Sequence, residues 1–190
     1  MRSKVVSFDL NTGKAPIADA SPLKRPLSGL KEIFYDQEAV KSILAKQDPM
    51  VYEFYDLHMP EREGDLAFGT SMVYPGKVGD EYYMTKGHFH TLIDTAEVYY
   101  CLKGYGMMMM ESPEGEIEYQ EMRPGQAVYV PGRYAHRSIN LSDTETLITF
   151  FGFRADAGHN YGTIEEKGFR KLVVARDNGY ALIDNPHWVG

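Results

Sequence analysis

The chain has 190 residues, of which 43% are hydrophobic and 25% are charged, and its formal net charge is −7. This length suits one domain, or one domain with an appendage, and such a chain buries enough surface to fold without a disulfide or a structural metal. The negative charge argues against a protein that coats nucleic acid or an anionic membrane, and no apolar run is long enough for a membrane span or an N-terminal signal peptide.

The N-terminal fifty residues predict an extended arm followed by a short helix. Residues 1–30 contain scattered proline and glycine with little periodicity, which is typical of strands and loops. Asp36 is a candidate helix N-cap, and four apolar residues follow it at helical spacing: Ala39, Val40, Ile43 and Leu44. We therefore predict a helix over residues 36–47, and we expect residues 1–50 to pack on a barrel.

From residue 51 onward the sequence changes to short runs rich in Val, Tyr, Phe, Ile and Thr, separated by turns that contain proline or glycine. Runs of this length and spacing indicate a β-sandwich or small barrel rather than alternating strands and helices. We assign residues 51–153 to the barrel and residues 154–190 to a C-terminal segment that closes the pocket and completes the sheets. All three parts belong to a single domain.

Two sulfur-containing features have ordinary structural interpretations. The run Met107 to Met110 predicts a strand that is buried on both faces. The alternative, a copper site, would need a nearby cysteine or further methionines at suitable spacing. Cys101 is the only cysteine, so no intrachain disulfide can form, and we expect a small buried side chain. Its isolation fits a reducing compartment, and we expect a soluble cytoplasmic protein.

The first candidate metal-binding segment contains His88 and His90. Side chains alternate along a strand, so these two imidazoles project from the same face. Glu97 opens the next run, with Tyr99 and Cys101 on its face. Residues between the two runs leave room for a loop that returns the chain antiparallel, and this would place Glu97 beside the imidazoles.

The second segment is Gly125-x5-Pro131-x4-His136-x3-Asn140, which again predicts strand, turn and strand. A His-x-His pair alone is more often a surface or core feature than a metal site. Here a glutamate and a third histidine accompany it, and three imidazoles with one carboxylate suit iron, manganese, nickel or zinc. The sequence therefore predicts a metal site.

These two segments resemble the paired motifs of the cupin superfamily, a small double-sheet barrel. The spacing from Glu97 to Gly104 fits, and so does the Gly125 to Asn140 pattern. The resemblance implies an all-β fold, a cupin double-stranded β-helix (jelly-roll-like) barrel with an N-terminal arm and a few short helices.

The resemblance narrows to the archaeal cupin-type glucose-6-phosphate isomerases. The string Tyr83-Met84-Thr85-Lys86-Gly87-His88-Phe89-His90 looks like that family's metal motif. Further segments are each similar to a stretch of the family: residues 61–66, 73–77 and 155–164, and the ending at 184–186. The similarity covers about residues 30–190 and is much more specific than the general cupin pattern.

This resemblance implies a homodimeric enzyme of glycolysis and gluconeogenesis that interconverts glucose 6-phosphate and fructose 6-phosphate. From the negative charge we expect no nucleic-acid or membrane partner. It implies one divalent metal per subunit, Fe²⁺ first, with Mn²⁺, Ni²⁺, Zn²⁺ or Co²⁺ as alternatives. The implied ligands are His88, His90, Glu97 and His136, and Glu97 is also the candidate catalytic base. The implied substrate contacts are Tyr52, Ser71, Thr85, Gly87, Tyr99, His159 and Tyr161.

Several alternatives stay open at this point. Hydrogen transfer could proceed as a proton through a cis-enediolate or as a direct 1,2-hydride shift. The same ligands could also serve a dioxygenase or a non-catalytic cupin that binds sugar phosphates. Lys86 could help to neutralise the phosphate, although a lone lysine is more often solvated. Val98, Tyr100 and Leu102 point away from the Glu97 face and would offer an apolar surface for a C2 dimer.

Overall fold

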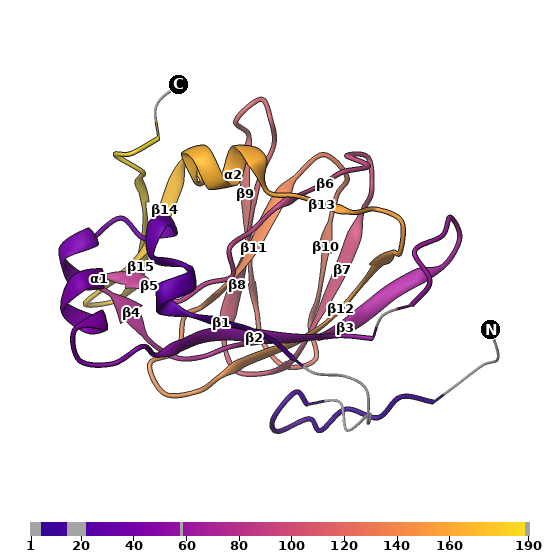
Figure 1. Cartoon of the computed structure of the whole chain (residues 1–190), viewed down its shortest axis with the longest axis horizontal. Coiled ribbons are helices and arrows are strands. Elements are labelled where there is room, and N and C mark those ends of the chain that lie inside the picture. Colours follow the sequence, from indigo (N-terminus) through magenta and orange to yellow (C-terminus); the bar gives the residue numbers. More distant parts are fainter. Residues whose placement is uncertain (1–4, 15–21, 58, 189–190) are drawn as a thin grey trace.

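The structure is a computed structural model, and it describes residues 5–14, 22–57 and 59–188. The predicted arm and C-terminal segment include residues 1–4, 15–21 and 189–190, which lie outside the described residues. Four β-sheets, with a few short helices, make up the described fold (Figure 1).

One wall of the barrel is a six-stranded antiparallel sheet in the order β1-β2-β3-β12-β7-β10. Its first strand comes from the N-terminal arm, so that part of the arm extends the sheet instead of only packing on it. The strands are β1 (Leu23–Pro26), β2 (Met50–Asp56), β3 (Leu66–Val73), β7 (Glu97–Lys103), β10 (Ala127–Val130) and β12 (Leu147–Arg154).

The facing wall is a three-stranded sheet in the order β11-β8-β9, with a two-stranded ladder, β13-β6, beside it. A bridge between His88 and His136 joins the β6 segment to β11. The walls meet where the Asn140 amide of β11 donates to the Val73 carbonyl of β3 at 2.8 Å. The strands are β6 (Phe89–His90), β8 (Gly106–Glu111), β9 (Ile117–Met122), β11 (Ala135–Asn140) and β13 (His159–Asn160). This arrangement confirms the predicted all-β cupin barrel.

The expected antiparallel return between the two metal-binding runs is wrong in its pairing. β6 pairs with β13, whereas β7 pairs with β10 and β12, so the two strands lie in different sheets. The connecting residues 91–96 carry the chain from one wall to the other. Glu97 therefore approaches the imidazoles across the barrel interior and not along a shared ladder.

A second layer covers the outer face of the three-stranded sheet at one end of the barrel (Figure 1). It is a four-stranded sheet in the order β15-β14-β5-β4, in which β14 from the C-terminal segment pairs with β5. The strands are β4 (Lys77–Val78), β5 (Glu81–Tyr82), β14 (Lys171–Arg176) and β15 (Gly179–Asp184).

The helices are short. α1 (Gln37–Leu44) begins at the predicted cap, where the Asp36 carboxylate accepts from the Ala39 N–H at 2.9 Å. It ends three residues before the predicted limit, because the chain tightens into a turn after Leu44. The others are the 3₁₀ turns η1 (Leu27–Gly29) and η2 (Lys31–Ile33), and α2 (Gly162–Lys167). Within the described residues, no helix has the length and apolar character needed to cross a membrane.

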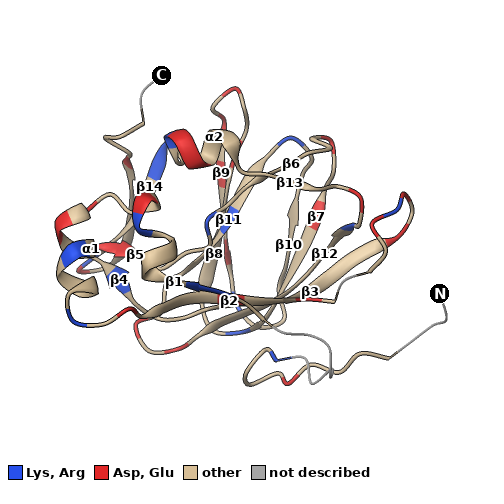
Figure 2. Cartoon of the chain, viewed as in Figure 1, with Lys and Arg blue, Asp and Glu red and all other residues tan. Residues whose placement is uncertain are grey.

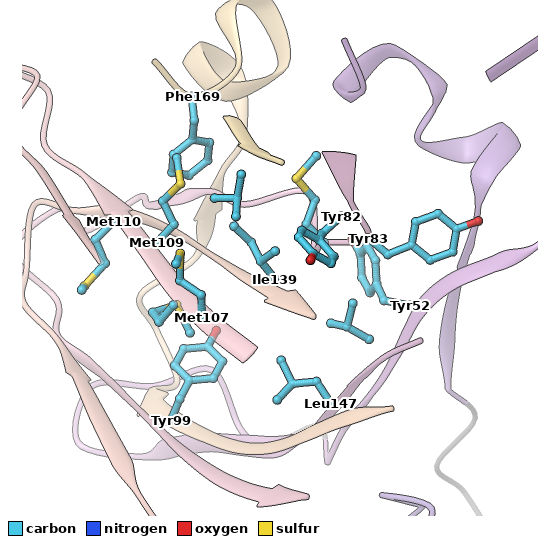
Figure 3. Packing of buried hydrophobic residues seen from close by; sticks show 14 of the residues in the cluster. Tyr52, Tyr82, Tyr83, Tyr99, Met107, Met109, Met110, Ile139, Leu147 and Phe169 are labelled. Carbon is cyan, nitrogen blue, oxygen red and sulfur yellow. The ribbon is translucent and has the colours of Figure 1, made fainter. Parts of the chain in front are cut away.

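The four-methionine run forms β8, and each of its side chains is at most 1% exposed. Met108 and Met110 stand opposite Ser138 and His136 of β11, while Met107 and Met109 face the other way (Figure 3). The predicted strand, buried on both faces, is confirmed. Cys101 is also fully buried, and burial raises the pKa of its thiol to about 11. The predicted small buried side chain is confirmed as well.

The described residues cover the outer face of the six-stranded sheet only in part. Phe8 of the arm packs edge-on against Phe150, with ring centroids 5.9 Å apart, and the Thr70 hydroxyl donates to the Gly13 carbonyl. Further along the sheet, Val98 is 40% exposed and Tyr129, its cross-strand partner, is 66% exposed. Charged side chains lie mainly on the helices and loops, and the strands of this sheet carry few (Figure 2).

Candidate active site

Four side chains from three segments converge inside the barrel. The ligand atoms of His88, His90, Glu97 and His136 all lie within 4.8 Å of one another. Glu97 Oε2 is 2.9 Å from His136 Nε2 and 3.2 Å from His90 Nε2, and these three side chains are almost completely buried. The structure therefore brings together the whole predicted ligand set.

The donor atoms of this cluster fit a metal ion. The Nε2 atoms of the three histidines and Oε2 of Glu97 are buried, and none makes a hydrogen bond within the described residues. Buried polar atoms without partners are costly, and a cation in their midst satisfies all of them together. Three nitrogens and one oxygen also suit a first-row divalent metal.

The outer ring nitrogens hold two imidazoles in place. His90 Nδ1 lies 3.3 Å from the Gly158 carbonyl oxygen, and His136 Nδ1 lies 3.3 Å from that of Tyr134. With Nδ1–H donating to these carbonyls, each Nε2 lone pair is directed to the centre of the cluster. Such contacts fix the tautomer and the orientation of metal-binding histidines.

The charge states of the cluster suit metal binding. Burial lowers the pKa of His88 well below its ordinary value, and the neighbouring His136 and His159 lower it further. Burial alone would raise the pKa of Glu97, but the imidazoles of His136 and His90 outweigh it and hold that pKa below the usual carboxyl range. His88 is therefore neutral and Glu97 ionised near neutral pH, as ligands must be.

The cluster opens into a cavity whose empty space, counted out to open solvent, is about 530 Å³. Every predicted substrate residue lines it, together with three of the four cluster residues; His90 lies behind them. The lining residues are Tyr52, Phe54, Ser71, Thr85, Lys86, Gly87, His88, Glu97, Tyr99, His136, Phe151, Phe153, His159 and Tyr161.

One side of the cavity presents small polar groups. The Thr85 hydroxyl oxygen accepts from the Ser138 N–H at 3.0 Å, which leaves its own proton free to donate to a ligand. Gly87 has φ +81°, and a Cβ there would lie 2.7 Å from the Phe169 ring, so only glycine fits. Ser71, on β3, is 6% exposed and adds a second hydroxyl.

The C-terminal segment supplies another part of the cavity lining. The His159 ring lies 4.3 Å from that of His88, centroid to centroid, and stacks nearly parallel on Tyr161. Their position depends on β13 pairing with β6, which local sequence does not reveal. The structure thus places both predicted residues at the mouth of the cavity, with His159 exposed.

Several site residues escaped the sequence analysis. Phe54 and Phe151 line the cavity among other strand aromatics, and nothing in their spacing distinguishes them. Arg25, on β1, lies beside Tyr52: burial raises the pKa of that phenol, and the Arg25 charge and the Lys86 N–H lower it. Lys86, for which the sequence left both a phosphate contact and a solvated position open, lies at the cavity and is mostly buried, with its ammonium over the Tyr161 ring and paired with Glu165. Sequence pattern alone would not place Arg25 at the pocket.

Comparisons with known proteins match this geometry to one family. The glucose-6-phosphate isomerase (GPI) family model matches residues 24–188. The chain belongs to the glucose-6-phosphate isomerase family. Relatives with that name include one from Thermococcus litoralis, 50% identical over 96% of this chain and 95% of its own. A bacterial relative from Sinorhizobium medicae is 39% identical over 95% of this chain and 85% of its own.

Two of the solved structures that the chain resembles share a much lower sequence identity with it than these isomerases do. A structure from work on the mechanism of oxalate oxidase has a TM-score of 0.49 and 14% identity, covering 62% of this chain and 58% of that one. Bacillus subtilis oxalate decarboxylase gives a TM-score of 0.45 and 23% identity, covering 55% of this chain and 26% of that one. The family assignment rests on the isomerase sequences.

Proposed function

We propose that the protein is a metal-dependent aldose–ketose isomerase that interconverts D-glucose 6-phosphate and D-fructose 6-phosphate. One observation carries the proposal: a metal-ligand cluster and a set of phosphate donors open into the same cavity. Membership of the glucose-6-phosphate isomerase family over residues 24–188 supports it.

The polar side of the cavity suits the phosphate group. The Thr85 and Ser71 hydroxyls and the Gly87 N–H are short, fixed donors on the cavity wall. Lys86 and Arg25 add positive charge close to them. With the phosphate held there, the open sugar chain reaches toward the cluster, and Tyr99, His159 and Tyr161 line its path.

Glu97 is the proposed base. Its low pKa keeps the carboxylate ionised, which is the form that accepts a proton. In the aldose-to-ketose direction it takes the proton from C2, and the electron pair moves into the C1–C2 bond to give a cis-enediolate. Return of that proton to C1, with transfer of the hydroxyl proton from O2 to O1, completes the ketose.

The proposed cofactor is one divalent ion held by His88, His90, Glu97 and His136, with Fe²⁺ as the first choice and Mn²⁺, Ni²⁺, Zn²⁺ or Co²⁺ as alternatives. The buried, unpartnered donor atoms of these residues support it. When bound, such an ion supplies Lewis-acid polarisation of the carbonyl. Three of the four residues that would hold it are buried.

We also propose that the protein is a C2 homodimer. The support is an apolar strip on β7 and β10 that the described part of the arm leaves open, where Val98, Tyr100 and Tyr129 are 40%, 42% and 66% exposed. Leu102, the third residue expected there, is less exposed and packs against the small core cluster that contains Ile148. A large exposed apolar strip is typical of an interaction surface.

A cytoplasmic location is proposed on chemical grounds. The single cysteine is buried and free, which suits a reducing compartment. Phosphorylated sugars of central metabolism are made and consumed inside the cell, where such an enzyme would meet its substrates.

A coupled assay for fructose 6-phosphate conversion, after chelation and reconstitution with one metal at a time, tests the function. An isomerase turns over equally well under argon, because the reaction consumes no oxygen. A dioxygenase stops under argon, and a binding module never turns over. Either of the last two results would overturn the proposal.

A further inference from the structure

Arg137 is a buried cation directly behind the phosphate side of the cavity. It lies on β11 beside His136, but its side chain leaves the opposite face of the strand and is only 3% exposed. Its guanidinium lies over the Phe169 ring at 4.1 Å, and Nη1 is 2.9 Å from Met84 Sδ. Among the described residues no carboxylate forms a salt bridge with it, and its Nε has no hydrogen-bond partner.

The strongest contact of Arg137 is with the backbone of the cavity wall. Nη2 donates to the Lys86 carbonyl at 2.7 Å. That carbonyl and the Gly87 N–H belong to one peptide group, and because the group is planar and trans they point in opposite directions. With the carbonyl turned outward to Arg137, the Gly87 N–H turns inward to the cavity. Within the described residues this N–H has no acceptor.

Phe169 completes the support of this peptide. The ring stacks on the guanidinium and packs beneath Gly87, close enough to exclude any Cβ. The peptide is therefore held between a buried cation on its oxygen side and the cavity on its N–H side. A cation that hydrogen-bonds to a carbonyl polarises the peptide and strengthens the N–H as a donor.

The positive charge of Arg137 is only partly cancelled by its neighbours. An arginine guanidinium keeps its proton in proteins, so Arg137 is a cation near neutral pH. Burial raises the pKa of Glu81, the leading carboxylate in its surroundings, to about 7, so that group is only partly ionised. The other, Glu111, is engaged by Arg170. Part of the positive electrostatic potential of Arg137 therefore extends to the cavity through the low-dielectric core.

We propose that Arg137 is a positioning residue for the substrate phosphate: it orients and polarises the Lys86–Gly87 peptide so that the Gly87 N–H donates to a phosphate oxygen. This inference rests on the proposed function, since it assigns a residue to the phosphate end of the same site. Arg137 itself does not touch the substrate.

The test compares Arg137→Met and Arg137→Lys with Ile139→Val in the metal-loaded protein. Ile139 shares the strand face and the core of Arg137, so its truncation disturbs packing without removing charge. The measurements are KM and kcat for fructose 6-phosphate, the calorimetric dissociation constant of sorbitol 6-phosphate, and bound metal. If Arg137→Met does not fold, Arg137→Gln, which keeps an amide donor, replaces it.

Loss of the charge should raise both KM and the dissociation constant about ten- to hundredfold, the usual worth of a hydrogen bond to a charged group. Because the phosphate lies away from the reacting carbons, kcat and bound metal should stay near wild type. Arg137→Lys should recover part of the loss, and Ile139→Val should change neither constant by more than about twofold.

An unchanged KM and dissociation constant in the neutral variant would overturn the proposal, as would a loss that Ile139→Val reproduces. If the wild-type protein binds sorbitol 6-phosphate but converts no fructose 6-phosphate, the proposed function is wrong. The dissociation constants of the variants then still test the role of Arg137. If the wild-type protein does not bind sorbitol 6-phosphate at all, both proposals fall.

Discussion

His136 and Glu97 belong to opposite walls of the barrel, yet His136 Nε2 and Glu97 Oε2 lie 2.9 Å apart. His136 is on β11 of the three-stranded sheet, and Glu97 opens β7 of the six-stranded sheet. The packing of the two sheets against each other therefore sets the geometry of the ligand cluster. A bound ion would in turn tie the walls together, which links metal affinity to the integrity of the barrel.

The first prediction concerns metal binding. His88→Ala and His136→Ala should each weaken metal affinity by more than about 100-fold, since even contacts behind the ligands are worth 10- to 100-fold. The fold should survive, because a chain of this size has its own core. Metal analysis and circular dichroism check both points. His159→Ala is the control and should keep its metal, while full occupancy in both ligand variants would show that the assignment is wrong.

The second prediction concerns hydrogen transfer. If Glu97 carries a proton, the proton rests on a carboxylate that faces the cavity and exchanges in part with water before it returns to C1. Glucose 6-phosphate deuterated only at C2 should therefore give fructose 6-phosphate with incomplete deuterium at C1, measured by mass spectrometry or NMR. Complete retention at every temperature would favour the hydride shift instead. Loss of activity in Glu97→Gln would not distinguish them, because that change also weakens the metal site.

The third prediction concerns Glu81, whose pKa burial raises from 4.5 to about 7. The folded protein then binds more protons than the unfolded chain between these values, so this group lowers the free energy of unfolding as pH rises from about 4.5 to 7. The full effect is about 3 kcal/mol. Glu81→Gln should flatten that part of the stability curve, as measured by urea unfolding at several pH values. Glu166→Gln, on the exposed side of α2, should leave the curve unchanged; a Glu81→Gln curve parallel to wild type would contradict the assignment.

The fourth prediction concerns assembly. Light scattering at micromolar concentration should give twice the chain mass of 21.6 kDa. Val98→Asp places a charge in the exposed strip of β7 and should shift the protein to monomer, because an unpaired charge is costly to bury at an interface. Tyr119→Asp, at a similarly exposed aromatic on β9, should leave the dimer intact. A monomeric wild-type mass would refute the dimer.

Local sequence pattern was sufficient to predict those features that depend only on residues close together in the chain. The Asp36 cap and its apolar spacing define the start of α1, and the four-methionine run defines a strand buried on both faces. Alternation along a strand placed His88 and His90 on one side, and the second motif supplied His136. These features follow from backbone geometry and side-chain period, which the sequence contains directly.

The sequence by itself determined the strand-rich composition, the donor types and their spacing. Only the tertiary structure decided that β6 pairs with β13 and not β7, which brings His159 to the cavity. It also placed Arg25 beside Tyr52 and Arg137 behind Lys86. The physical reason is that pairing between distant strands is set by how whole apolar faces pack, and a strand carries no local mark of its partner. The metal-donor residues could therefore be predicted from the sequence. The positions of the cations Arg25 and Arg137 near the cavity could not, because they depend on how the sheets pack.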